Sequence, residues 1–285
     1  MPAEVQQPQW QIWSVPKPMA QLFDKFPLVE HPAALLPATP NTPKHADQPT
    51  LYIYSTAIDS SAHSPSFDAE CLKWQTALLL AGLPFNAVSS NRHASPTFTL
   101  PFLNEPLSGP LVYSSGILKW IQENPSANLA AYLDEKTQAD ATAFTSLIES
   151  KIHNAWIYTC FLEPKNYQAV ALPWYTKATA WPVNLWIGRQ IREEKRAEIE
   201  AKRTVNGEEI YADAAAAFAA IAAALGDDEW FFASREPTLL DATLFTYTHL
   251  ILSSPLVQDG IRQIVRTHGN LVQHAKRVYD RCYRK

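Results

Sequence analysis

The stretch that decides the fold is Pro237-Thr238-Leu239-Leu240-Asp241-Ala242-Thr243-Leu244-Phe245-Thr246-Tyr247. Thr238 stands where an N-cap hydroxyl can accept a hydrogen bond from the first backbone N–H groups of a helix. Asp241, three residues later, can accept from the N–H of Thr238, which completes a capping box. The residues that follow are apolar on almost every side, so the pattern predicts a buried helix over 238–253 in an all-helical core.

The composition predicts a folded protein that binds no nucleic acid. The chain has 285 residues, of which 47% are hydrophobic and 18% charged, enough for two modest domains or one large one. The net charge of -4 argues against a nucleic-acid partner. Cys71, Cys160 and Cys282 are far apart and show no metal-binding spacing, which favours a reducing compartment. No run reaches the roughly 18 apolar residues of a membrane-spanning helix, so we expect any membrane contact to be peripheral.

Three regions follow one another along the chain. Residues 1–49 hold 10 of the 22 prolines together with several aromatic residues, which predicts an extension docked on its own fold or on a partner. Residues 50–125 alternate short apolar runs with helical patterns, and residues 134–285 show helical periodicity alone. We therefore expect an α/β N-terminal domain of the thioredoxin-like type followed by an all-α C-terminal domain.

The helices and strands of the α/β domain can be placed from apolar runs and from the residues that begin or end them. A helix is expected from 68 to 81, stopped by Gly82, and a second from 116 to 123, capped by Ser114 or Ser115. Strands are expected at 51–54, 84–88, 99–103 and 110–113. In the second domain, helices are expected at 139–162, 184–203, 209–225, 238–253, 255–267 and 269–283.

Two motifs resemble the glutathione-transferase fold. Leu100-Pro101-Phe102 is similar to the strand that this fold enters through a cis-proline. Ser114-Ser115-Gly116-Ile117-Leu118 is similar to the helix start that grips the γ-glutamyl group of glutathione, although a plain N-cap explains Ser115 equally well. The resemblance implies a glutathione-transferase-like architecture with an inter-domain groove near Pro101 and Ser115.

Two departures from that fold count against catalysis. The segment Ser89–Phe98 is short and polar, with little room for the second helix that helps to build the thiol site of a transferase. Ser64-Pro65-Ser66 could mimic an activated hydroxyl at a helix N-terminus, but it is equally a loop and a cap. His93 and His249 are expected to be structural. We therefore expect no catalytic residue, no metal and no cofactor, with a glutathione-dependent transferase as the alternative.

The closer resemblance is to the metaxin family, through short segments spread in order from about residue 50 to residue 283. These segments are Ser66-Phe67-Asp68-Ala69-Glu70-Cys71-Leu72, Ala81-Gly82-Leu83-Pro84, Ser95-Pro96-Thr97-Phe98-Thr99-Leu100-Pro101, Trp181-Pro182-Val183-Asn184-Leu185-Trp186, Pro237 to Phe245, and His268-Gly269-Asn270-Leu271-Val272-Gln273-His274. Gly269 stands where the family has a proline.

The metaxin resemblance implies a non-enzymatic subunit of the sorting and assembly machinery of the mitochondrial outer membrane. Such a subunit is peripheral, of the metaxin-2 type, and lies on the cytosolic face. Its implied partners are the barrel-forming channel subunit, a second metaxin-like subunit, and the C-terminal β-signal of β-barrel precursors. An adaptor of the same family that is unrelated to barrel assembly is the alternative.

The best candidate for a partner or membrane contact is the region 172–203. Its aromatic rings are of the kind found at membrane interfaces, and its cations could meet phosphate headgroups or acidic loops. Glutamates interleave with these cations, so ion pairs along the helix are the alternative reading of its charged part. The candidate contact residues are Trp174, Tyr175, Trp181, Trp186, Arg189 and Arg192.

Overall fold

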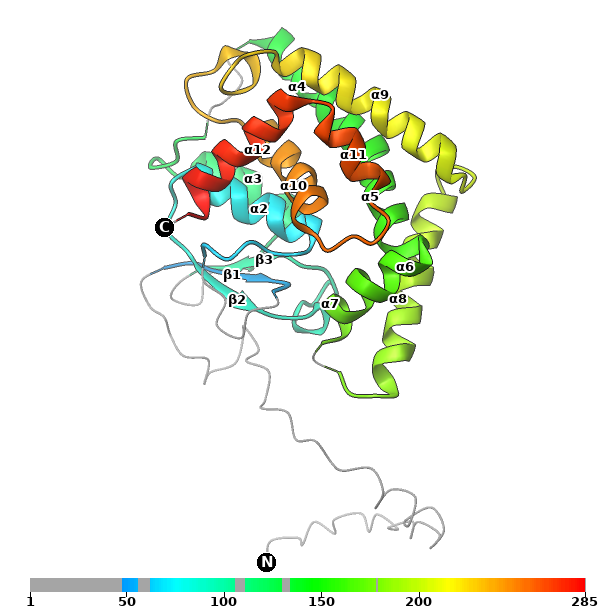
Figure 1. Ribbon diagram of the computed structural model, residues 1–285. Coiled ribbons are helices and arrows are strands. Elements are labelled where there is room, and N and C mark those ends of the chain that lie inside the picture. Colours follow the sequence, from blue (N-terminus) through cyan, green and yellow to red (C-terminus); the bar gives the residue numbers. More distant parts are fainter. Residues whose placement is uncertain (1–47, 56–61, 106–110, 130–133, 178, 285) are drawn as a thin grey trace, which may run out of the picture. The chain divides into compact units, whose positions relative to one another are not determined.

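The computed structural model describes residues 48–55, 62–105, 111–129, 134–177 and 179–284 (Figure 1). The chain divides into two compact units, Met1–Leu35 and Leu36–Lys285, and every described residue lies in the second. The proline-rich extension expected at 1–49 falls outside the described residues except for its last two positions.

A four-stranded mixed sheet forms the N-terminal part of the described fold. Its strands are β1 (Thr50–Ile53), β2 (Asn86–Ser89), β3 (Phe102–Asn104) and β4 (Leu111–Tyr113), in the order β2-β1-β3-β4. β1 pairs parallel with β2, and β3 pairs antiparallel with both β1 and β4. Parallel pairing requires a crossover, and helix α2 (Ala69–Leu80) supplies it.

The two helices of this part begin in different ways. At the start of α2, Asp68 Oδ1 accepts from the N–H of Cys71 at 3.1 Å, and Gly82 at φ +71° follows the end of the helix. Helix α3 (Ser114–Glu123) runs directly out of β4, so Tyr113 is its N-cap residue and no side chain caps it. The expected hydroxyl cap at Ser114 or Ser115 is therefore wrong, because both serines already lie inside the first turn.

The connection between β2 and β3 contains one 3-10 turn, η1 (Arg92–Ala94), and no longer helix. The chain then passes Phe98, whose φ is +55°, and enters β3 through a cis Leu100–Pro101 peptide bond. The structure therefore shows the cis-proline of the expected fold without a second helix before it.

The C-terminal part of the described fold is entirely helical. The expected helix over 139–162 forms a continuous α- and π-helical segment from Glu135 to Leu162. The helix expected at 255–267 begins only at Gly260, because Asn166 Oδ1 accepts from the N–H groups of Val257 and Gln258 and holds that segment in a non-helical bend. The elements are α4 (Glu135–Leu147), η3 (Ile148–Ile152), α5 (His153–Ile157), η4 (Tyr158–Leu162), α6 (Pro164–Asn166), η5 (Tyr167–Ala171), α7 (Leu172–Thr176), α8 (Val183–Glu200), α9 (Gly207–Leu225), η6 (Phe231–Ala233), α10 (Leu239–Ser253), α11 (Gly260–Arg266) and α12 (Gly269–Cys282).

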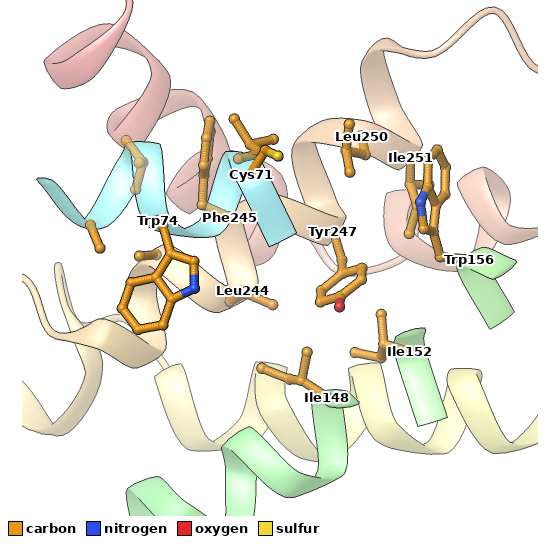
Figure 2. Close-up of a cluster of buried hydrophobic side chains, with 14 of the residues drawn as sticks. Cys71, Trp74, Ile148, Ile152, Trp156, Leu244, Phe245, Tyr247, Leu250 and Ile251 are labelled. Carbon is orange, nitrogen blue, oxygen red and sulfur yellow. The ribbon is translucent and has the colours of Figure 1, made fainter. Parts of the chain in front are cut away.

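Helix α10 lies at the centre of the core and packs against α2 and α12 (Figure 1). Figure 2 shows its apolar side chains meeting Cys71 and Trp74 of α2 on one side and Ile152 on the other. Helix α2 is also joined to the end of α12, where a hydrogen bond of 2.7 Å links the hydroxyls of Thr76 and Tyr283. The fold is thus the expected α/β domain followed by an all-α domain, joined through one apolar core.

The start of α10 is a capping box whose carboxylate is completely buried. Thr238 Oγ1 accepts from the N–H of Asp241 at 3.4 Å, and Asp241 Oδ2 accepts from the N–H of Thr238 at 2.7 Å. Asp241 Oδ1 also contacts His274 Nε2 of α12 at 2.9 Å and accepts from the N–H of Phe231 at 3.3 Å. The box therefore ties three separate segments together in addition to capping a helix.

Candidate functional surfaces

Trp174 and Tyr175, the first two candidate contact residues, lie at the interface between the helical domain and the start of α2. The Tyr175 hydroxyl donates to Asp68 Oδ2 at 2.8 Å, and its ring packs edge-on against Phe67 at 5.1 Å between centroids. Burial raises the pKa of the Tyr175 hydroxyl well above its ordinary value. Trp174 packs on the other side of Phe67 at 5.4 Å. Both side chains are half-buried and connect the two domains through Phe67, and their contact with a partner or membrane stays a prediction.

Trp181 and Trp186 occupy a different environment, at the turn between α7 and α8. Their side chains are 70% and 67% exposed, and two aliphatic residues between them, Val183 and Leu185, are also exposed. Helix α8 buries the opposite face, where Gly188 lies against Leu172 of α7. The sequence already carried a signal for Leu185, because positions 185, 186 and 189 share one side of a helix.

Arg189 and Arg192 also have different environments: Arg189 is exposed at the surface, and Arg192 makes contacts within the fold. Arg192 donates from Nε to the carbonyl of Phe161 at 2.8 Å and from Nη2 to that of Leu162 at 3.0 Å. Its guanidinium lies over the ring of Tyr167 at 4.6 Å. Arg189 is exposed on the same face as Trp186. Arg192 therefore fixes α8 to the bundle, whereas Arg189 faces solvent.

The acidic end of α8 is held by ion pairs, as the alternative reading of its charges expected. Lys195 pairs with Glu198 at 2.9 Å along the helix. Glu198 also contacts His153 Nε2 at 2.8 Å, and the hydrogen bond from His153 is the main cause that lowers the pKa of Glu198 to about 2. Arg92 of the β2–β3 connection reaches Glu194 at 2.8 Å. This end of the helix is an anchor within the fold.

The residues that could imitate a transferase nucleophile are occupied or buried. Ser66 Oγ donates to the carbonyl of Tyr54 at 2.6 Å and accepts from the N–H of Asp68 at 3.2 Å. Burial raises the pKa of the Cys71 thiol well above its ordinary value, which disfavours the reactive thiolate. Ser64 contributes its carbonyl, which accepts from Gln75 Nε2 at 2.8 Å. The Ser66 hydroxyl and the Cys71 thiol are therefore not prepared for nucleophilic attack.

The two histidines weighed in the sequence have aromatic neighbours. His249 stacks between Phe245 at 5.1 Å and Tyr279 at 5.4 Å, and burial lowers its pKa to about 4. His93 lies at the surface, edge-on to the ring of Phe98 at 6.1 Å.

The groove expected near Pro101 and Ser115 stays a prediction. Pro101 is buried and Ser115 is exposed at the start of α3. A cavity of about 340 Å³ lies elsewhere, beside His63, Phe85 and Cys282, and one of about 520 Å³ lies among the ion pairs of Lys151 and Arg203. Neither cavity is lined by Pro101 or Ser115.

The described residues contain neither a candidate metal cluster nor a helix that could span a membrane. No group of three or more His, Cys, Asp or Glu residues there could hold a metal ion. Nor does any helix among them combine the length and apolar character that crossing a membrane requires.

Comparison with known proteins gives two family matches along the chain. Residues 71–192 match a family described as an outer mitochondrial membrane transport complex protein, and residues 214–278 match the C-terminal domain of glutathione S-transferases. Metaxin-1 from Mus musculus is 27% identical over 225 residues, which cover 76% of this chain and 70% of that protein. The chain is therefore similar to metaxins over about three quarters of its length.

Other metaxins are similar to the same extent. Metaxin-3 from Xenopus laevis is 28% identical over 77% of this chain and 70% of its own length. Metaxin-2 from Mus musculus is 24% identical over 75% of this chain and 81% of its own length. These identities do not separate the metaxin subtypes.

Solved structures support the fold of this metaxin-like chain. The β-etherase LigF from Sphingobium aligns with a TM-score of 0.56 at 14% identity, over 81% of this chain and 94% of that one. Glutathione transferase F7 from Populus trichocarpa aligns with a TM-score of 0.51 at 14% identity, over 83% and 96%. At these identities the likeness concerns architecture and carries no inference about activity.

Proposed function

We propose that this protein is a non-enzymatic subunit of the sorting and assembly machinery of the mitochondrial outer membrane. In this proposal it is peripheral, of the metaxin-2 type, and lies on the cytosolic face beside the barrel-forming channel subunit and a second metaxin-like subunit. Its task is to help recognise the C-terminal β-signal of β-barrel precursors and to promote their insertion.

The observation that carries the proposal is the match of residues 71–192 to the outer-membrane transport family. That segment begins at Cys71 in α2, runs through β2 to β4, and ends at Arg192 in α8. It therefore includes the interface at Tyr175 and the exposed turn before α8. Similarity to metaxins over about three quarters of the chain supports the same role.

The proposal predicts that glutathione chemistry is absent. Ser66 is buried with its hydroxyl engaged, and burial holds Cys71 in the thiol form. The purified chain is therefore expected to give no turnover in a glutathione conjugation assay and no retention on immobilised glutathione. Turnover that is lost on the substitution Ser64→Ala would support the transferase alternative instead.

A strand-shaped ligand would be held by backbone hydrogen bonds and by pockets for alternate side chains. We place this cradle near Pro101 and Ser115, where the related fold receives a peptide. A photo-crosslinking residue at exposed Ser115 is expected to capture the C-terminal strand of a precursor. The control position is exposed Glu123, eight residues further along α3 and therefore about 12 Å away. Equal capture at both positions would argue against a defined cradle there.

Native purification from mitochondrial membranes separates this proposal from the adaptor alternative. The tagged chain is expected to bring down the barrel-forming channel subunit and a metaxin-like partner. Recovery without any barrel protein favours the adaptor. Alkaline carbonate extraction should release a peripheral subunit, and resistance to extraction would contradict that part of the proposal.

A further inference from the structure

The turn between α7 and α8 is the clearest surface feature that the fold does not use. In Figure 1 it forms the lower tip of the helical part, where the chain enters α8. Trp181, Val183, Leu185 and Trp186 are all at least half exposed there. Large exposed apolar clusters on soluble domains mark surfaces that meet another protein or a membrane.

Charge distinguishes between those two occupants. From Pro164 to Arg192 the chain contains no Asp or Glu, while Lys165, Lys177, Arg189 and Arg192 are basic. Arg192 donates its hydrogen bonds inside the fold. Lys177 and Arg189 are exposed, one before and one after the apolar turn in the sequence. An apolar tip flanked only by cations is complementary to an anionic lipid surface.

Along α8, apolar residues come first, a cation second and acids last, which is the order expected of a helix that enters a membrane interface by its N-terminal end. Trp186 lies in the first turn, and Arg189 follows less than one turn later on the same exposed side, where a long cationic side chain can reach headgroups. The first acid, Glu193, comes about 10 Å beyond Trp186 along the helix axis. Apolar faces of interfacial helices enter to about 5–10 Å. The acidic end of α8 therefore stays outside the lipid.

We infer that the α7–α8 turn inserts Trp181, Val183, Leu185 and Trp186 into the interface of an anionic phospholipid surface, with Lys177 and Arg189 at the headgroups. The inference rests on the membrane location in the proposed function and adds the residues and the lipid class that bind. Helix α8 enters by its N-terminal end, while Arg192 and the ion pairs of Glu194 and Glu198 fix its other end to the fold.

Vesicle flotation of the purified full chain tests the inference without a precursor or channel. We expect binding to vesicles of phosphatidylcholine with phosphatidylserine, weak binding to phosphatidylcholine alone, and release by salt. The double variant Trp181→Ser/Trp186→Ser should bind at least about tenfold more weakly. The substitution Arg189→Gln should weaken binding about fivefold, and Arg235→Gln, at an exposed arginine before α10, should leave it unchanged.

The chain offers a matched pair of exposed valines. Val183 on the turn is 51% exposed and Val257 before α11 is 60% exposed. Val183→Ser should weaken vesicle binding and Val257→Ser should not, with thermal unfolding confirming that both variants fold. Equal effects of the two substitutions on vesicle binding overturn the inference. A wild-type chain that does not bind anionic vesicles also overturns it.

Two other results would assign the turn to a different occupant and overturn the inference. One is a dimer in light scattering that the double tryptophan variant dissociates. The other is capture of the channel subunit that depends on Trp181 and Trp186 without any vesicle binding. The proposed function fails separately, if the chain binds anionic vesicles through this turn but neither the channel subunit nor a precursor associates with it.

Discussion

The substitution Asp241→Ala tests how the fold is held together at its centre. Asp241 is fully buried, and four donors surround its carboxylate: the N–H and hydroxyl of Thr238, each at 2.7 Å, the N–H of Phe231, and Nε2 of His274. An alanine at this position leaves all four without an acceptor in a region that water does not reach. The cost should therefore exceed that of a lost helix cap.

The magnitude follows from two overlapping contributions. Loss of an N-cap interaction costs about 1 kcal/mol, and each buried donor that is left without its acceptor costs about 1–3 kcal/mol. Because both describe the same carboxylate, we expect a loss of about 4 kcal/mol in the free energy of unfolding. For a chain of 285 residues that lowers the melting temperature by roughly 7–8 °C.

Thermal and denaturant unfolding of matched variants measure this loss. The control is Asp134→Ala, because Asp134 caps α4 by accepting from the N–H of Thr137 at 2.9 Å but lies at the surface. The variant His274→Gln, which retains a donor near Asp241, should fall between the two. If Asp241→Ala costs no more than Asp134→Ala, the buried network contributes nothing beyond a cap and the reasoning is refuted.

Three further predictions concern pH and the helix anchor. Burial lowers the pKa of His249 to about 4, so as the pH falls the unfolded chain takes up a proton before the folded chain does. The free energy of unfolding therefore falls between about pH 6.5 and pH 4, by up to about 3 kcal/mol. The substitution His249→Phe should remove that loss when unfolding is measured as a function of pH. The pKa of Glu198 is lowered to about 2, so its ionised carboxylate stabilises the fold above about pH 4.5, and this stabilisation is lost as the pH falls to 2. The substitution Glu198→Gln should make the free energy of unfolding less dependent on pH between 4.5 and 2. Arg192→Met should cost about 1–3 kcal/mol in denaturant unfolding, because two carbonyls lose their donor, whereas Arg189→Met should cost almost nothing. Unchanged pH profiles, or equal costs for the two arginines, would contradict these assignments.

The features that could be predicted from sequence are those determined within a few residues. The capping box needs only the spacing of Thr238 and Asp241, and the burial of α10 follows from its apolar character on every side. The cis peptide bond before Pro101 could be predicted only from the resemblance to the glutathione-transferase fold. The failed cap at Ser115 shows the limit of local rules, because the junction of β4 with α3 leaves no room for a separate capping residue.

The roles of the surface candidates depend on distant partners that no local pattern contains. Tyr175 packs within the fold because its hydroxyl donates to Asp68, which is 107 residues away. Arg192 is structural because two carbonyls of η4 face it from an earlier helix. Trp181 and Trp186 differ from Tyr175 only in that nothing in the described fold packs over them. Composition predicts an aromatic region, but only the tertiary structure separates its internal rings from its exposed ones.

The most direct test of the central claim is site-specific crosslinking of this chain to a β-barrel precursor arrested during assembly in isolated mitochondria. The account predicts that the C-terminal strand of the precursor crosslinks to the chain. It also predicts that a precursor whose alternating apolar residues in that strand are replaced by serine does not. Equal crosslinking of both precursors, or of neither, would contradict a role in β-signal recognition.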